Sequence, residues 1–189
     1  FYLIYAFFQA VITGRGIKNI VKWRYYGREE RRAMVYVAVT ALLAALDLVI
    51  KNEIEDRPDE DFPREIEQTG GRIILRKTHN SGFSFGLLKK HPQLVTMLPL
   101  ACGSFFAGMF AEILSKKGRV LEKTAFSLVL AGAASNLFDR LARGYVVDYF
   151  SIKVKKLEKV VFNLGDLFIL LGAGLYMTVK LVGMIKEKR

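Results

Sequence analysis

Residues that commonly carry catalysis are scarce in this 189-residue chain. Its one cysteine, Cys102, has no second thiol to pair with and lies inside an apolar run, where burial leaves a thiol unreactive; we expect it to be a small packing residue. The two histidines, His79 and His91, are not at metal-ligand spacing. The few serines and threonines show neither a nucleophile elbow nor a triad partner. The sequence therefore argues against thiol, zinc and serine-nucleophile chemistry, and predicts no metal and no cofactor.

Hydrophobic residues make up 52% of the chain and are gathered in four nearly uncharged runs: 34–50, 94–114, 124–138 and 160–185. A helix that spans a bilayer needs about 20 mostly apolar residues. The second and fourth runs reach that length, and the first and third reach it if flanking residues snorkel or the helix tilts. We predict a mainly α membrane protein with four transmembrane helices.

The formal net charge of +11 is distributed as in a membrane protein and does not predict a nucleic-acid partner. Basic clusters precede the first run, separate the second from the third, and end the chain. With four spans they share one face, which the positive-inside rule makes cytoplasmic, together with both termini. Segment 51–91, with eight Lys/Arg against eight Asp/Glu, then lies outside. Four lysines oppose this topology because they fall on the predicted outer face: Lys153, Lys155, Lys156 and Lys159.

Residues 1–33 are predicted to be an apolar and basic interfacial extension, and residues 34–189 the membrane domain. Segment 1–12 is apolar but too short to span as given, so it is either the remnant of a longer hydrophobic segment or a helix lying in the interface. No small-residue cleavage site follows it, which argues against a cleaved signal peptide.

The polar segments between the runs predict a small sheet. Segment 51–68 is charged, contains two prolines and is expected to be an exposed loop. Strands are predicted at 72–77 and 145–155, with turn residues at 79–82 and alternating residues at 83–86. Unpaired backbone groups are not tolerated in lipid, so we expect the sheet, formed by the first and third interhelical segments, outside the outer leaflet.

Acids beside membrane-length runs are functional candidates because charge at that depth is costly. Asn136, Asp139 and Arg140 share one face of the third helix. They follow the small residues 131–135, which permit close helix packing. Two interpretations stay open: a helix-end ion pair or network with an interhelical amide, or a functional cluster. Asp148 differs, because it lies in an apolar strand with no opposite charge within four residues.

Asn163 and Asp166 also allow two interpretations. They are spaced as an N-cap and the third residue of a helix, which is a capping box. A carboxylate at that helix start would also face whatever Asp148 faces. Two such acids resemble an aspartic-protease dyad, in which one proton is shared, the ionised acid activates a water and the protonated acid supplies a proton.

The ordered motifs resemble those of the bacterial lipoprotein signal peptidases (signal peptidase II). They are Asp47 with Lys51, His79-Asn80-Ser-Gly82, Asn136-Leu-Phe-Asp139-Arg140, Gly144-Tyr-Val-Val-Asp148 and Phe162-Asn163-Leu-Gly-Asp166. The resemblance implies a membrane aspartic endopeptidase that cuts a prolipoprotein before its diacylglyceryl-modified cysteine. Its partners would be that substrate and membrane lipid. It would be a multi-pass protein of the bacterial cytoplasmic membrane, with its site near the outer leaflet. The sequence does not reveal the oligomeric state, although we favour a monomer.

By motif position, Asp148 and Asp166 would be the catalytic dyad. A second group would line the substrate groove: Asn80, Gly82, Asn136, Arg140 and Asn163. Asp139 would support the site, with Asp47 and Lys51 in supporting places at its rim. The chain departs from the family pattern at Ser135, usually Gly, and at Gly165, usually Ala; both swaps are small and are expected to change packing little. The segment 51–68 and the N-terminal segment are longer than usual.

Three other functions compete with this one. A different intramembrane aspartic protease would carry Gly-x-Gly-Asp, whose first glycine is replaced by Asn163 here. A catalytically altered homologue would use the acids structurally. A transporter would use them to carry ions, but the paired repeats typical of transporters are absent from the sequence.

Overall fold

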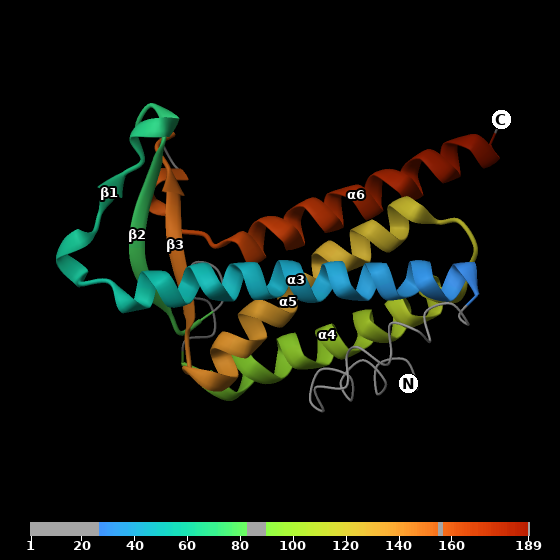
Figure 1. Ribbon diagram of the computed structural model, residues 1–189, viewed down its shortest axis with the longest axis horizontal. Coiled ribbons are helices and arrows are strands. Elements are labelled where there is room, and N and C mark those ends of the chain that lie inside the picture. Colours follow the sequence, from blue (N-terminus) through green and yellow to red (C-terminus); the bar gives the residue numbers. More distant parts are fainter. Residues whose placement is uncertain (1–26, 83–89, 155–156, 189) are drawn as a thin grey trace.

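Four long helices form a bundle, and a three-stranded sheet closes one end of it (Figure 1). The computed structural model describes residues 27–82, 90–154 and 157–188, so the interfacial extension before residue 27 and the alternating residues 83–86 lie outside it. The helices are α3 (Arg28–Asp56), α4 (Pro92–Ser115), α5 (Val120–Ala142) and α6 (Leu164–Glu187).

Three of these helices are long and apolar enough to cross a membrane: Glu30–Asp56, Gln93–Ser115 and Leu164–Glu187. At 1.5 Å per residue, the 24 residues of α6 extend about 36 Å, more than the hydrocarbon core of a bilayer. Helix α3 extends beyond the predicted run at both ends, which supplies the length that the run lacked. Helix α5 contacts all three other helices and buries Ser127, Ser135 and Asn136 against them. The fold is thus the predicted four-helix membrane protein, although among the described residues α5 does not reach the hydropathy of a membrane span.

Small residues bring α5 and α6 into backbone contact, as predicted for segment 131–135. Ala131 is fully buried. At Gly132, an added Cβ would lie 2.0 Å from the carbonyl oxygen of Gly165 and 2.9 Å from Ile169 Cγ1. The backbones can approach this closely because both positions are glycine, and the contact lies beside the start of α6.

Gly132→Ala is therefore expected to push α6 away from α5 and to lower the free energy of unfolding by about 1–3 kcal/mol or more, because backbone cannot yield as a side chain can. Thermal unfolding in detergent would register this as a loss of several degrees. Gly174→Ala is the matched control on α6, where an added Cβ meets nothing within 4 Å. Equal melting temperatures for the two variants would contradict the close packing.

The sheet has the order β1–β2–β3 and is antiparallel throughout. Its strands are β1 (Arg64–Glu65), β2 (Ile73–Asn80) and β3 (Val146–Ile152). Register pairs Thr78 with Asp148, after an irregularity between Leu75 and Thr78. Although β3 is an edge strand, Val146 to Ser151 are all buried, because α3 and the start of α6 cover it; Ile54, Ile50 and Leu167 pack against Val147 and Tyr149.

Three local predictions need correction. The turn expected at 79–82 begins later, since β2 continues through Asn80. The loop expected at 51–68 contains the last two turns of α3, where Lys51 and Ile54 are buried, followed by the 3₁₀ helices Asp59–Asp61 and Glu67–Thr69 around β1. Cys102 is exposed on α4, so it is not a packing residue. The sequence could not show which side of α4 faces the other helices.

Lys77 explains why α3 ends where it does. Its Nζ donates to the carbonyl oxygens of Glu55 (3.1 Å) and Arg57 (2.9 Å), two of the carbonyls left without partners at a helix C-terminus. The same ammonium lies 2.8 Å from the exposed Asp59 carboxylate. Strand β2 is therefore tied directly to the end of the helix that carries Asp47 and Lys51.

Candidate active site

Asp148 is held by two amide side chains from different elements. Its side chain lies on β3 and is 5% exposed. Asn80 Nδ2, at the end of β2, donates to Oδ2 at 3.1 Å, and Asn163 Nδ2, before α6, donates to Oδ1 at 2.7 Å. Burial, followed by the nearby Asp166 carboxylate, raises the pKa of Asp148 to about 7. The sequence showed no opposite charge within four residues of Asp148, and in the structure two neutral amides donate hydrogen bonds to it.

Asp166 is the third residue of α6 and closes the predicted capping box. Its N–H donates to Asn163 Oδ1 at 2.8 Å, and its Oδ2 accepts the Asn163 N–H at 3.3 Å. Oδ1 accepts Asn136 Nδ2 from α5 at 2.9 Å. The capping box is therefore confirmed, and the second Asp166 oxygen faces Asn136, so the functional interpretation of the same two residues stays a prediction.

Asn163 joins the two acids. This fully buried residue donates its side-chain amide to Asp148 and its backbone N–H to Asp166. A backbone bridge between Phe150 and Phe162 sets the distance between strand and helix, with the Phe162 N–H donating to Phe150 O at 2.8 Å. Acids 18 positions apart in the chain thus meet around one amide.

Arg140 links the α5 end of the site to the segment after β2. Its Nη1 donates to Asn136 O and its Nη2 to Gly82 O, both at 3.2 Å. The Gly82 N–H in turn donates to Asn80 Oδ1 at 3.1 Å, which fixes the orientation of the amide that bonds Asp148. All five predicted groove residues therefore lie in the same hydrogen-bonded cluster as the two acids.

A buried ion network adjoins the two candidate acids through Asn136. Lys51 Nζ is 3.1 Å from Asp47 Oδ2 and 3.0 Å from Asp139 Oδ2, and all three side chains are fully buried. Lys51 also donates to Asn136 Oδ1 at 2.8 Å. Asp47 and Lys51 are therefore inside the protein, and the prediction that they lie at the rim is wrong: the amphipathic end of α3 packs inward against α5.

Asp139 is held by groups from α3, from the end of α5 and from β3. It forms ion pairs with Lys51 and with Arg143, which follows it by four residues and whose Nη1 lies 3.4 Å from Asp139 Oδ1. Its Oδ2 also accepts the Val147 N–H at 3.1 Å. Asp139 thus connects the end of α5 to the start of β3, the strand that carries Asp148.

Two hydroxyls in this network were not predicted. Ser135 Oγ donates to Asp47 Oδ2 at 2.6 Å and accepts Lys51 Nζ at 3.1 Å, so Ser135 is more than a small packing residue. The Tyr149 hydroxyl donates to Asp47 Oδ1 at 2.9 Å. A Cβ added at Gly165 would lie 2.9 Å from Asp47 Oδ2, so this departure from the family pattern also touches the network. Tyr149 follows Asp148 directly, the one sequence signal that could have drawn attention to it.

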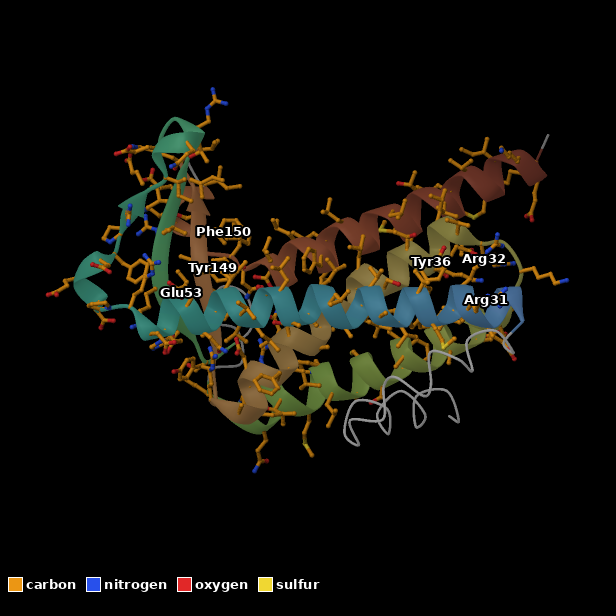
Figure 2. The ribbon with its side chains drawn as sticks, viewed as in Figure 1. Arg31, Arg32, Tyr36, Glu53, Tyr149 and Phe150 are labelled. Carbon is orange, nitrogen blue, oxygen red and sulfur yellow. The ribbon has the colours of Figure 1, made fainter. Side chains whose placement is uncertain are left out.

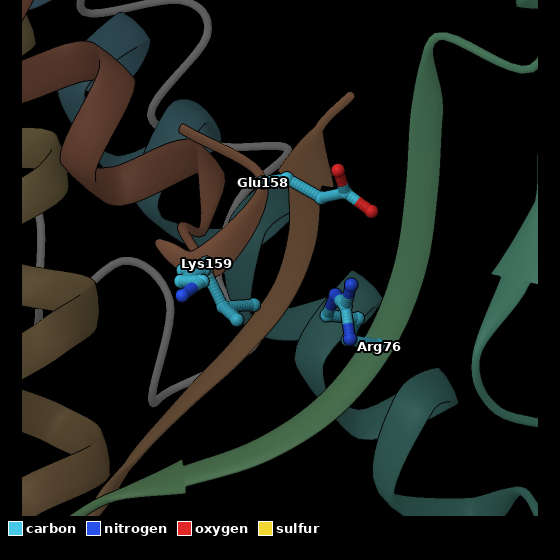
Figure 3. A pocket seen from close by; sticks show the side chains of 4 residues that line it. Arg76, Glu158 and Lys159 are labelled. Atoms are coloured by element: carbon cyan, nitrogen blue, oxygen red, sulfur yellow. The ribbon is translucent and has the colours of Figure 1, made fainter. Parts of the chain in front are cut away.

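A separate hollow of about 450 Å³ lies on the sheet (Figure 3). It is lined by Arg76, Glu158, Lys159 and Val161, none of which contacts the acids described above. Arg76 Nε donates to the buried Ser151 Oγ at 2.8 Å, and Glu158 extends into the hollow from the opposite side. Its mixed charges are typical of a solvated surface, so the two buried acids are the stronger candidates for chemistry.

Residues 39–182 match the family model described as signal peptidase (SPase) II, which covers more than half of the chain. The chain belongs to the signal peptidase II family. Lipoprotein signal peptidases of Brucella ovis and Brucella melitensis are each 35% identical over 117 residues, which is 61% of this chain and 72% of theirs. The resemblance drawn from the motifs is thereby confirmed, and this family member is a multi-pass membrane protein of the aspartic endopeptidase type.

Two solved structures, each described as a bacterial membrane enzyme determined by the in meso method, at 2.3 and 1.9 Å resolution, share the fold. Their TM-scores are 0.67 and 0.63 at 20% sequence identity, over 82% and 78% of this chain and 92% of each of theirs. At that identity the likeness concerns architecture alone: the same helix bundle with its small sheet.

Proposed function

We propose that Asp148 and Asp166 are the catalytic dyad of a lipoprotein signal peptidase that cuts a prolipoprotein immediately before its diacylglyceryl-modified cysteine. The observation that carries this is the shared amide: Asn163 bonds both acids, in a site where burial keeps one of them neutral near pH 7. Two nearby carboxylates cannot both ionise at low cost, so the pair holds one proton.

The shared proton permits peptide hydrolysis by the dyad's own groups. The ionised acid takes a proton from a water, whose oxygen forms a bond to the scissile carbonyl carbon, while the protonated acid donates its proton to the carbonyl oxygen. The tetrahedral adduct then collapses: the C–N bond breaks, the leaving nitrogen takes the proton that the first acid gained from water, and the other acid takes a proton from one hydroxyl of the adduct. A new carboxyl group remains, and the pair again holds one proton. Activity therefore falls as the pair loses its last proton, which burial places near pH 7.

The neighbouring amides and guanidinium would bind the substrate backbone. Asn80 and Gly82 follow β2, and Asn136 and Arg140 lie on α5, so a chain entering between sheet and helices would pass both acids. Arg140 and the asparagines are donors that suit peptide carbonyls. A donor-rich groove recognises backbone and lipid in preference to a long side-chain code.

The site would face the outer leaflet. Arg31 and Arg32 lie at the end of α3 opposite the sheet, whereas Tyr149 and Phe150 lie at the sheet end (Figure 2). The connection from α4 to α5 and the end of α6 share the basic end (Figure 1). By the positive-inside rule the basic end is cytoplasmic, which puts the dyad beside the outer leaflet, where a lipidated cysteine would be anchored.

The test is cleavage by purified protein in detergent or lipid. We expect a diacylglyceryl prolipoprotein to be shortened in a gel-shift assay, and the same precursor with an unmodified cysteine to be cut at least about tenfold more slowly, since lipid contacts contribute transition-state binding. Failure to cut either precursor would favour a catalytically altered homologue. Equal cleavage of both would favour an intramembrane aspartic protease of another type.

A further inference from the structure

Asp47 is a junction between four elements near the dyad. Its carboxylate, on α3, accepts four donors: the Ser135 hydroxyl from α5 (2.6 Å) and Lys51 Nζ (3.1 Å) on Oδ2, and the Tyr149 hydroxyl from β3 (2.9 Å) and the Leu164 N–H from α6 (3.1 Å) on Oδ1. The carboxylate is fully buried. A buried charge is tolerated when donors surround it in this way.

Tyr149 connects this junction to the segments that carry the two acids. Besides donating to Asp47, its oxygen accepts the Leu164 N–H at 3.0 Å, one of the N–H groups that a helix start leaves without an intrahelical partner. Tyr149 directly follows Asp148, and Leu164 lies between Asn163 and Asp166. The phenol therefore links the strand that carries one acid to the first residue of the helix that carries the other, with Asp47 as the common partner.

On these contacts we propose that Tyr149 is a positioning residue, whose hydroxyl sets the separation of Asp148 and Asp166 through Asp47. The proposal rests on the function proposed above. Tyr149 is 4% exposed and packs its ring 5.6 Å from that of Phe150, so the phenol reaches Asp47 in a fixed direction. Removing the oxygen frees the Leu164 N–H from one acceptor and Asp47 from one donor, which lets β3 and α6 move apart.

Separation of the acids has a measurable signature. Part of what keeps Asp148 protonated is the nearby Asp166 charge, and this repulsion weakens as the carboxylates separate. The last proton of the pair then leaves at lower pH, and the alkaline limb of the activity profile shifts to lower pH. The other charged groups around the dyad are unchanged by removing the phenol: Asp47, Lys51, Asp139 and Arg140.

Tyr149→Phe tests the proposal, and Tyr145→Phe is its matched control. Tyr145 also gives its hydroxyl to a carboxylate, Glu55 Oε2 at 3.1 Å, which is a partner other than Asp47. For Tyr149→Phe we expect kcat to fall about tenfold, the effect of losing one hydrogen bond to a charged group, with KM little changed and the alkaline limb moved to lower pH. For Tyr145→Phe we expect the kinetics and pH profile of the wild-type protein.

A double-mutant cycle with Asp47→Asn gives the second readout. If Tyr149 acts through Asp47, its substitution costs much less in the Asp47→Asn background. Two results would overturn the proposal while wild-type protein still cleaves its substrate. One is a Tyr149→Phe variant with the wild-type kcat and pH profile, and the other is additive effects in the cycle. Wild-type protein that cleaves no precursor would instead refute the proposed function.

Discussion

Replacing Asp148 or Asp166 by asparagine is expected to reduce prolipoprotein cleavage by about 10²–10⁴-fold or more, the contribution of a general acid or base. Asparagine is nearly isosteric and keeps an oxygen that can accept the Asn163 amide now bonded to Asp148. It cannot exchange the proton, so neither water activation nor protonation of the leaving nitrogen proceeds. The measurement is the initial rate of the gel-shift assay with equal amounts of folded protein.

Asp61→Asn is the matched control, because Asp61 is an exposed acid in a 3₁₀ turn outside the site; its rate should be unchanged.

The melting temperature shows whether a dyad variant has lost its chemistry or its fold. Because burial raises the pKa of Asp148 from 3.8 to about 7, the folded state keeps a proton that the unfolded chain releases, and stability falls as pH rises between these values. Asp148→Asn should therefore melt higher than the unchanged protein at pH 8 and equally at pH 4. Full activity in either dyad variant would refute the assignment.

Lys51→Met is expected to lower the free energy of unfolding by about 3–5 kcal/mol, the usual effect of removing one partner from a buried ion pair. Methionine fills similar space, so the loss is electrostatic. Asp47 and Asp139, both fully buried, would lose the ammonium that lies 3.1 and 3.0 Å away. Asn136 would lose the donor that fixes its amide, so cleavage should fall as well. Thermal and chemical unfolding in detergent measure the first effect.

The control for this prediction is Lys116→Met. Lys116 pairs with Glu112 on the surface, where the two side chains are 45% and 66% exposed, and exposed pairs contribute about 0–1 kcal/mol. The two variants remove the same charge and add the same side chain, so only burial differs between them. Equal destabilisation by both would mean that the network beneath the dyad is solvated.

The sequence-based predictions succeeded where local pattern and local chemistry coincide. Apolar runs and small residues determined the helices and the close contact of α5 with α6, because the composition of a helix surface decides what can cover it. The spacing of Asn163 and Asp166 defined a capping box that the structure contains. The same reasoning failed for Lys51, since a charged stretch that follows an apolar run is usually exposed and nothing local indicates a buried lysine.

By itself the sequence determined the helical membrane architecture and the family, and it singled out Asp148 and Asp166 as the candidate dyad. Only the tertiary structure decided what surrounds them. Asp47 meets Ser135, Tyr149 and Leu164, which are 88, 102 and 117 positions away, and periodicity carries no information on contacts at such separations. Those contacts depend on how α3 rotates against α5 and how β3 docks on α6. That packing turns an acid expected at the rim into a buried junction between α3, α5, β3 and α6, beside the two candidate acids.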